Sequence, residues 1–453
     1  MSKNLVVATP GSSPSKTTVS ESPTSMVFAR KPARPRAGES DIDVTLLMPC
    51  LNEARTLPQC IANAQAALEA LQGAHGLRGE IVVSDNGSDD GSVALAESLG
   101  ARVVRCKVRG YGAALRAGTL AARGRYVLMG DADASYDFLD GIPMIEKLML
   151  GADLCLGSRF AGKILPGAMP WKNRYIGNPV LTFVLNLLFR SGFTDAHCGL
   201  RALTKEAFLE INPTSTGMEY ASEMVIKATL LGCQRAETPI VLRPDGRDRP
   251  PHLAPFRDGW RHLRYLIMLS PAWLYLFPGV ASVAAGLGLF CVLLAHPPGD
   301  VVVVGPLWFG DHWMPVAMGM VVGGYWSILF AMATTLVGIR NGYRRLTRPL
   351  ALLYRCSRLE TLLVVAAVSL VLGAVLMGDV LLSWAGQHFG ALSMLRQVMA
   401  GTTAFVVGLQ SFFGGFLLSV IAGNDSDPER AAGEAGSPRL SMALSVEYGV
   451  NGE

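Results

Sequence analysis

Four long apolar stretches toward the C-terminal end do most to limit what this chain can fold into. They cover residues 271–295, 313–339, 361–377 and 398–422. An α-helix needs roughly 20 predominantly apolar residues to cross the hydrocarbon core of a bilayer. The third stretch reaches that length only past Asp379, which either ends the helix near an interface or lies within it. The pattern predicts a transmembrane domain of about four spans over residues 271–423.

The arginines predict how these spans are oriented. The loop between the second and third stretches, RNGYRRLTRPLALLYRCSR, holds six arginines, whereas the loops 296–312 and 386–397 hold only Arg396 between them. Loops rich in Lys and Arg remain on the cytoplasmic side of a membrane. We therefore expect a multi-pass protein of the cell (inner or plasma) membrane, with both termini and the N-terminal half in the cytoplasm.

A basic and aromatic segment comes just before the first apolar stretch. Residues 256–269 mix three arginines and a histidine with Trp260, Tyr265 and leucines. Helices of this composition lie in the membrane interface, with their basic side chains on anionic headgroups. We predict an interfacial amphipathic helix within residues 251–270. The alternative is an ordinary solvated helix at a domain edge.

Residues 41–250 have the alternating pattern of an α/β domain. Short apolar runs typical of strands occur at 44–49, 80–84, 101–106, 125–130 and 152–158. Helical stretches lie between them at 57–72, 91–99 and 112–124. Such alternation predicts a Rossmann-like, mostly parallel sheet with helices on both faces. In these sheets ligands bind beyond the carboxyl ends of the strands.

The terminal segments, the net charge and the cysteines limit which partners and structural elements the chain can have. Residues 1–40 and 424–453 are polar and low in large apolar side chains, so we expect a disordered arm and a disordered tail. A net charge of +4 is too small to indicate nucleic acid. The eight cysteines form no C-x-x-C pair, which favours reduced thiols over a zinc site or a disulfide framework.

Two acids follow the fourth predicted strand. In YVLMGDADASYDF (126–138), Asp131 and Asp133 are separated by one residue. Residues i and i+2 of an extended chain share a side, so both carboxylates can converge on one hard cation such as Mg2+. The alternative is an acidic turn that caps a helix beginning near Phe138.

Three more polar segments follow strands or open helices near the same edge. They are MPCLNE (48–53), SDNGSDDGS (84–92) and RGYGAALRAG (109–118). Asp85 can accept hydrogen bonds from a nucleobase, and the glycine-rich turn at Gly110 opens a helix whose N-terminus favours anions. Each segment alone is explained by turn chemistry, but together with the acid pair they predict a nucleotide and metal site.

The order of these motifs resembles a known family. P-C-L-N-E, D-N-G-S-D-D-G-S, G-Y-G-A-A-L, D-A-D, G-S-R-F and C-G-L-R are arranged as in the GT-A glycosyltransferases of family 2. Within that family the chain is most similar to the membrane-anchored polyprenyl-phosphate glycosyltransferases, which include dolichyl-phosphate mannose and glucose synthases. The resemblance covers residues 43–250. It implies inverting transfer of one sugar from a nucleotide diphosphate, of the UDP-glucose or GDP-mannose type, to a polyprenyl phosphate.

The resemblance also assigns residues. It implies a divalent metal, Mg2+ or Mn2+, on Asp131 and Asp133, and catalytic roles for these two acids together with Arg159 and Arg201. Tyr111 stands where many relatives have Lys, and Ser135 where many have Gln. The implied nucleotide-binding residues are Pro49, Asn52, Glu53, Asp85, Gly110 and Asp131.

Arginines near the membrane side are candidates for the lipid phosphate, because a guanidinium fork binds phosphate in a bidentate way. The resemblance places Arg159, Arg174 and Arg201 there. Arg247 and Arg249 lie in PDGRDRPPHL (244–253), directly before the interfacial helix. For each arginine alone, a surface charge or a structural ion pair is the alternative.

Two residues of DAHCGLR have open roles. His197 has three alternative roles: a general base, a ligand, or a structural histidine beside the acceptor loop. Asp195 can orient Arg201 through a salt bridge.

Two rival functions remain. A processive polysaccharide synthase also joins this fold to spans, although the chain lacks the Q-x-x-R-W segment of that group. A catalytically inactive membrane scaffold or flippase component is the other, with GMVVG (319–323) in helix packing and Asp379 on a transport path. Assembly into a homo-oligomer is left open.

Overall fold

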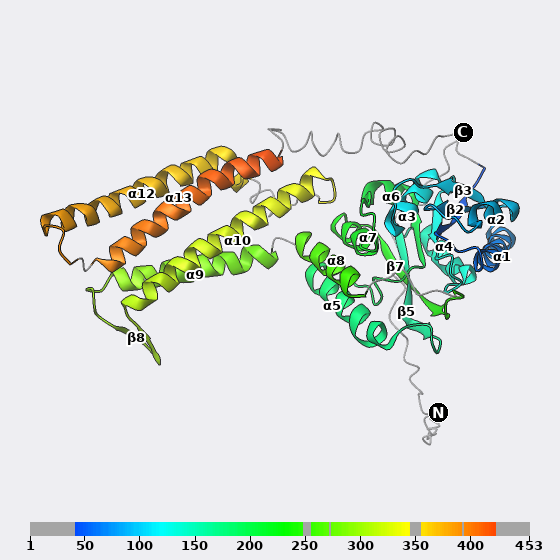
Figure 1. Ribbon diagram of the computed structural model, residues 1–453, viewed down its shortest axis with the longest axis horizontal. Coiled ribbons are helices and arrows are strands. Elements are labelled where there is room, and N and C mark those ends of the chain that lie inside the picture. The colour runs from blue at the N-terminus through cyan, green and yellow to red at the C-terminus, as the bar shows by residue number, and fades with distance from the viewer. Residues whose placement is uncertain (1–40, 248–254, 271–272, 345–354, 392–393, 423–453) are drawn as a thin grey trace, which may run out of the picture.

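The computed structural model describes residues 41–247, 255–270, 273–344, 355–391 and 394–422. The predicted arm 1–40, the tail 424–453, Arg249 and the boundary at residue 250 lie outside these residues. Figure 1 shows an α/β part, coloured blue to green, beside long helices coloured green to red.

Within the described residues, seven strands form one sheet in the order β3-β2-β1-β4-β6-β5-β7. β1 pairs in parallel with β2 and β4, β2 with β3, and β5 with β7, whereas β6 runs antiparallel to β4 and β5. The mostly parallel sheet is thus confirmed, with two strands, β6 and β7, that the sequence pattern did not predict. The strands are β1 (Val44–Cys50), β2 (Gly79–Asp85), β3 (Arg102–Arg105), β4 (Tyr126–Met129), β5 (Leu154–Ile164), β6 (Arg201–Thr204) and β7 (Arg235–Leu242).

Helices cover both faces of this sheet. Alternate side chains of β1 divide between them: Leu46 and Met48 pack with α1 and α4, and Leu47 packs with α3 and α7. Because both faces are covered, β1 is apolar at almost every position. The helices of this half are α1 (Leu57–His75), α2 (Ser92–Ser98), α3 (Tyr111–Ala121), α4 (Ile142–Met149), α5 (Asn178–Phe189), α6 (Lys205–Ile211) and α7 (Tyr220–Leu230).

The parallel strands bring their carboxyl ends to one edge. Cys50 at the end of β1 is opposite Asp85 at the end of β2. The amide of Gly130, just after β4, donates to Leu47 O of β1 at 3.0 Å. The loops that follow β1, β2 and β4 therefore meet, as predicted from the strand order.

Four helices among the described residues are long and apolar enough to cross a membrane. Asp379 lies inside the third of them, α12, which continues to Gly386. The second stretch begins with a short turn at Asp311, and a two-stranded hairpin of β8 (Val302–Val304) and β9 (Leu307–Phe309) precedes it. The long helices are α9 (Trp273–Leu294), α10 (Met314–Arg340), α12 (Leu359–Gly386) and α13 (Leu395–Ala422).

Glycines let α9 and α10 approach closely. A Cβ atom on Gly324 would lie 2.7 Å from Gly279 O, and one on Gly286 would lie 2.8 Å from Ala317 O. Met320 and Val321 of GMVVG pack against α9, as expected for helix packing, but its two glycines take no part, because a Cβ atom added to Gly319 or Gly323 would meet no other atom within 4 Å. Gly324, one residue later, makes the contact.

The helix α8 (Pro255–Met268) connects the two halves. It lies beside α5 in Figure 1, with Leu266 fully buried against the α/β half and Trp260 exposed. Arg344, beyond the end of α10, donates to the carbonyls of Leu269 and Ser270 at 3.3 and 2.9 Å. These contacts fix α8 at the junction, while its position in a membrane interface stays a prediction.

Candidate functional site

The loops after β1 and β2 are joined by side-chain hydrogen bonds. Asn52, at φ 58°, donates its amide to Ser88 Oγ and accepts from the amide of Asp89, both at 2.9 Å. Asp85 accepts from the amides of Gly87 and Ser88 at 3.0 and 3.1 Å. Asn52 and Asp85 therefore shape this edge, directly beyond Pro49 of β1. Their contact with a nucleotide stays a prediction.

The two aspartates of D-A-D follow β4, as predicted. Asp131 Oδ1 accepts from the hydroxyl of Tyr111 at 2.9 Å. Asp133 Oδ1 accepts from the amide and the hydroxyl of Ser135 at 3.0 and 2.6 Å. Burial raises the pKa of the Asp131 carboxyl to about 6, and the negative charge of Asp133 adds to this effect. The site therefore concentrates negative charge where water is scarce.

A third acid, Glu53, joins the aspartates through an arginine. Arg247 Nε donates to Glu53 Oε1 at 2.8 Å, and Nη1 of the same guanidinium lies 3.0 Å from Asp133 Oδ2. Glu53 is only 5% exposed, and its own amide donates to Ser92 Oγ at 3.0 Å. The guanidinium of Arg247 thus neutralises two acids of the site. The sequence pattern did not predict this position for Arg247.

These residues fit a hard divalent cation. Across the described parts of the chain, no group of three or more His, Cys, Asp or Glu is placed to hold a metal. Mg2+ is commonly bound by one or two carboxylates, with water and substrate phosphates as its other ligands. Asp131 and Asp133 supply such a pair, and the guanidinium of Arg247 already occupies the place of a cation beside Asp133. The hydroxyl of Ser135 is directed at Asp133.

The glycine-rich turn before α3 has a packing role. A Cβ atom on Gly110 would lie 2.1 Å from Thr216 O, and one on Gly112 would lie 2.3 Å from Ser215 O. The amide of Gly110 donates to Asn86 Oδ1 at 2.6 Å. The Gly110 amide is therefore already bonded and is not available to the anion that was expected at this helix end. The sequence analysis did not predict this role of Asn86. The turn instead brings Tyr111 to Asp131.

A loop over residues 195–200 lies against the acid pair. A Cβ atom on Gly199 would be 2.6 Å from Asp131 Oδ2, so only glycine fits at this distance. The amide of Gly199 donates to Tyr136 Oη at 3.0 Å. Arg201 lies beneath the loop, 3% exposed, and donates to the carbonyls of Ala196, Cys198 and Ala221 at 2.7–2.9 Å. Arg201 therefore supports the loop from inside.

The same loop holds Arg159. Asp195, fully buried, accepts from Arg159 Nε and Nη2 at 2.6 and 2.7 Å. The proposed pairing of Asp195 with Arg201 is thus wrong, because the bidentate partner of Asp195 is Arg159. β5 continues beyond the predicted strand 152–158, and its register shifts after Ser158 where Arg159 emerges.

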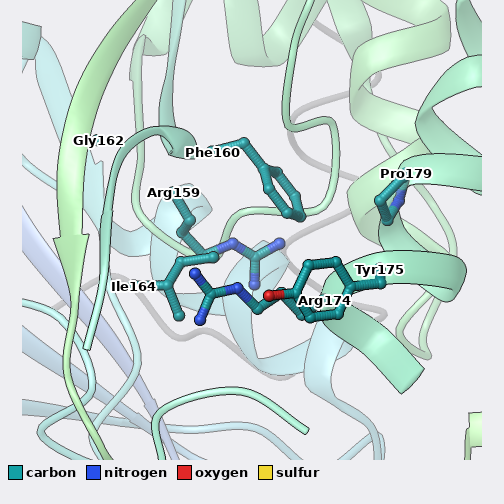
Figure 2. A pocket seen from close by; sticks show the side chains of 7 residues that line it. All are labelled: Arg159, Phe160, Gly162, Ile164, Arg174, Tyr175 and Pro179. Carbon is teal, nitrogen blue, oxygen red and sulfur yellow. The ribbon is translucent and has the colours of Figure 1, made fainter. Parts of the chain in front are cut away.

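Arg159 and Arg174 share a pocket of about 390 Å³. Figure 2 shows both guanidinium groups reaching into it, Arg159 from one side and Arg174, together with Tyr175 and Pro179, from the helical segment on the other side. Arg174 comes from the helical turn Asn173–Gly177 that precedes α5, and its guanidinium carbon lies 5.5 Å from the ring centre of Tyr175. The pocket is lined by Arg159, Phe160, Gly162, Ile164, Arg174, Tyr175 and Pro179.

His197 takes part in a buried polar chain. Its Nε2 lies 3.0 Å from Ser222 Oγ, which lies 2.8 Å from Nδ1 of His262 in α8. Burial lowers the pKa of His197 well below its ordinary value, and the nearby His262 lowers it further. A neutral histidine that links α7 to α8 fits the structural role among the alternatives.

Comparison with known proteins gives consistent matches. Residues 45–211 match the model of Glycosyl transferase family 2, and residues 332–422 match the Glycosyltransferase family 2 C-terminal transmembrane region. Over 387 residues, 84% of this chain and 90% of the relative, the chain is 35% identical to the low-salt glycan biosynthesis hexosyltransferase Agl6 of Haloferax volcanii.

Two further matches cover the α/β half. A dolichyl-phosphate hexose transferase of Haloferax volcanii is 30% identical over 221 residues, which are 48% of this chain and 89% of that protein. The crystal structure of Mycobacterium tuberculosis glucosyl-3-phosphoglycerate synthase with Mn2+ and UDP-glucose overlays at a TM-score of 0.38 and 21% identity. That overlay covers 52% of this chain and 83% of that structure.

Proposed function

The chain belongs to glycosyltransferase family 2, and on this basis we propose that it transfers one sugar from a nucleotide diphosphate to a polyprenyl phosphate, with inversion. The observation that carries the proposal is the two-arginine pocket, joined to the acid pair by a single loop on a membrane protein. The dolichyl-phosphate hexose transferase among its relatives supports the same acceptor class.

The donor half of the site is built on Asp131 and Asp133. Asp131 and Asp133 would hold a divalent cation, which would neutralise the charge that develops on the departing nucleotide diphosphate. Tyr111 fixes the orientation of Asp131, and Ser135 fixes that of Asp133. Pro49, Asn52, Glu53, Asp85 and Gly110 are proposed for the nucleotide side of this edge.

The acceptor half is the pocket of Arg159 and Arg174. Phosphate monoesters have a second pKa of about 6, so a polyprenyl phosphate is largely ionised at pH 7 and attacks without a protein base. Arg159 is buried and held by Asp195 on one edge of its guanidinium, whereas Arg174 is half-buried. The guanidinium pair binds the phosphate and directs one oxygen toward the sugar.

The membrane arrangement follows from the same geometry. The pocket is next to α5, which contacts α8, and α8 leads into the first span. Arg340 and Arg344 lie near the end of α10 at this junction, which by the positive-inside rule supports a cytoplasmic position for the catalytic half. We propose a cell (inner or plasma) membrane location and a membrane-held acceptor that enters beside α8.

Transfer is tested with purified full-length protein in nanodiscs, polyprenyl phosphate, Mg2+ or Mn2+, and radiolabelled UDP-glucose or GDP-mannose. We expect one chloroform-soluble labelled lipid and release of the matching nucleotide diphosphate. Asp131→Asn and Asp133→Asn should abolish transfer without unfolding the protein. An ethanol-insoluble polymer would instead identify a processive synthase, and no product with any donor would favour an inactive scaffold.

A further inference from the structure

The segment that leads from β7 toward the membrane lies across the loop that carries Asp133 and Ser135. The amide of Arg243 donates to Ser135 O at 3.0 Å, and the amide of Gly246 donates to Asp133 O at 2.9 Å. These two backbone bonds bring Arg247 to Glu53 and Asp133. In sequence, the same segment precedes α8, whose Ile267 carbonyl accepts a hydrogen bond from Tyr275 of the first span.

The guanidinium of Arg247 is inserted between two acids that the rest of the protein shields from water. Its side chain is 16% exposed, and those of Glu53 and Asp133 are 5% and 10% exposed. It donates to Glu53 Oε1 through two nitrogens, at 2.7 and 2.8 Å, and a third nitrogen lies 3.0 Å from Asp133 Oδ2. The contact spans 194 residues of chain, so it exists only in the folded protein.

A metal ion and this guanidinium would compete for Asp133. Both are cations, both need the oxygens of that carboxylate, and like charges repel strongly where water is excluded. A diphosphate bound with the metal changes the balance, because its oxygens offer the displaced guanidinium a new anionic partner. Metal and diphosphate would then favour each other's binding, and such coupling is reciprocal.

We propose that Arg247 occupies the cation position of the donor site in the metal-free protein and must be displaced for the metal to bind. The arginine thereby makes metal binding depend on the nucleotide diphosphate, so that the site is assembled only when the donor is present. Displacement also breaks the link between Glu53 and the segment that precedes α8. This inference rests on the donor half of the proposed function and deepens it.

The test measures Mn2+ binding to the full-length protein by electron paramagnetic resonance of the free ion, alone and with UDP or GDP. In the wild type, Mn2+ alone should bind weakly, and whichever of UDP and GDP fits the site should strengthen Mn2+ binding. Arg247→Ala and Arg247→Gln should bind Mn2+ alone at least about tenfold more tightly, the scale on which a neighbouring opposite charge changes the proton affinity of a carboxylate. Both variants should lose most of the enhancement by nucleotide.

Arg243→Ala is the matched control. It removes the same charge from the same segment, but Arg243 pairs with Asp137 and Asp140 at 2.9 and 3.6 Å. Its Mn2+ affinity and its response to nucleotide should equal those of the wild type. The glutamine variant keeps hydrogen-bond donors, which provides a folded protein if the alanine variant is unstable.

Equal or weaker Mn2+ binding by a folded Arg247 variant would overturn the inference. This readout uses neither sugar nor lipid, so it is separate from the test of transfer. Tighter Mn2+ binding without a lipid-linked sugar product leaves the inference intact and refutes the transfer reaction. If the wild type makes a lipid-linked sugar but substitution of Arg247 leaves Mn2+ affinity unchanged, the transfer reaction is supported and the inference about Arg247 is refuted.

Discussion

Replacing Gly199 by alanine should separate the chemistry of the site from the stability of the fold. Gly199 does not have a positive φ, so alanine can adopt its backbone conformation. The added Cβ would instead lie 2.6 Å from Asp131 Oδ2 and 2.9 Å from a ring carbon of Tyr136. The substitution therefore acts on the carboxylate that we assign to the metal.

The size of the effect follows from the overlap. A Cβ atom ordinarily keeps about 3.4 Å from a neighbouring oxygen, so the Asp131 carboxylate must retreat by roughly 0.8 Å. Asp131 has a short side chain that is also held by Tyr111, and Mg2+ demands near-ideal octahedral geometry at about 2.0–2.1 Å. A displacement of about 1 Å in a catalytic arrangement costs on the order of 10²-fold in rate. Overpacking alone should cost only about 1–3 kcal/mol of unfolding free energy.

The assay compares kcat of sugar transfer, Mn2+ affinity and thermal unfolding for Gly199→Ala and the wild type. We expect kcat and Mn2+ affinity to fall together while the protein stays folded. Gly73→Ala is the control, because Gly73 lies in α1 with no atom within 4 Å of the added Cβ. A folded Gly199→Ala protein with unchanged kcat and Mn2+ affinity would refute the assignment of Asp131 to the metal.

The remaining predictions use the titration of Asp131, the ion pair of Arg159 with Asp195, and the pocket of Arg159 and Arg174. Because burial raises the pKa of Asp131 to about 6, its carboxyl is protonated at lower pH. Mn2+ affinity, measured as a function of pH, should therefore weaken as the pH drops below 6. Asp131→Asn should abolish this pH dependence. The raised pKa also means that burial of the ionised form destabilises the metal-free protein increasingly as pH rises toward 6, which thermal unfolding with and without Mn2+ should detect. Asp195→Asn leaves the charge of Arg159 buried without its partner and should cost about 3–5 kcal/mol in chemical denaturation. Arg174→Gln should raise KM for polyprenyl phosphate by at least about tenfold with KM for the nucleotide sugar unchanged, whereas the exposed Lys172→Gln should change neither constant.

The strands and helices that the sequence predicted are those whose environment repeats along the chain. VTLLMP of β1 is apolar at every position except Thr45 because helices cover both faces, and the long apolar helices are uniform because they face lipid or one another. The strands that were missed depend on distant partners. β6 (Arg201–Thr204) has four residues and exists through antiparallel pairing with β4 and β5, which no local pattern encodes.

The candidate site divides in the same way. The acid pair could be located from the sequence because D-A-D follows an apolar strand, and parallel strands end at one edge. The arginines could not be sorted, since charge alone does not distinguish Arg201, buried under a loop, from Arg174, which reaches into a pocket. Nor could local spacing bring Arg247 to Glu53 across 194 residues.

The loop over residues 195–200 explains why donor and acceptor sites should respond together to mutation. At one end Asp195 binds Arg159 of the proposed acceptor pocket, and near the other end Gly199 lies against Asp131 of the proposed donor site. Arg201 fixes the loop from below through the carbonyls of Ala196 and Cys198 and ties it to Ala221 of α7, so a shift at one end of the loop should be felt at the other. In-line attack requires the phosphate oxygen and the sugar carbon about 3–3.5 Å apart. A rigid spacer between the two half-sites meets that requirement, and we therefore expect substitutions beneath it, such as Arg201→Lys, to lower kcat more than they raise either KM.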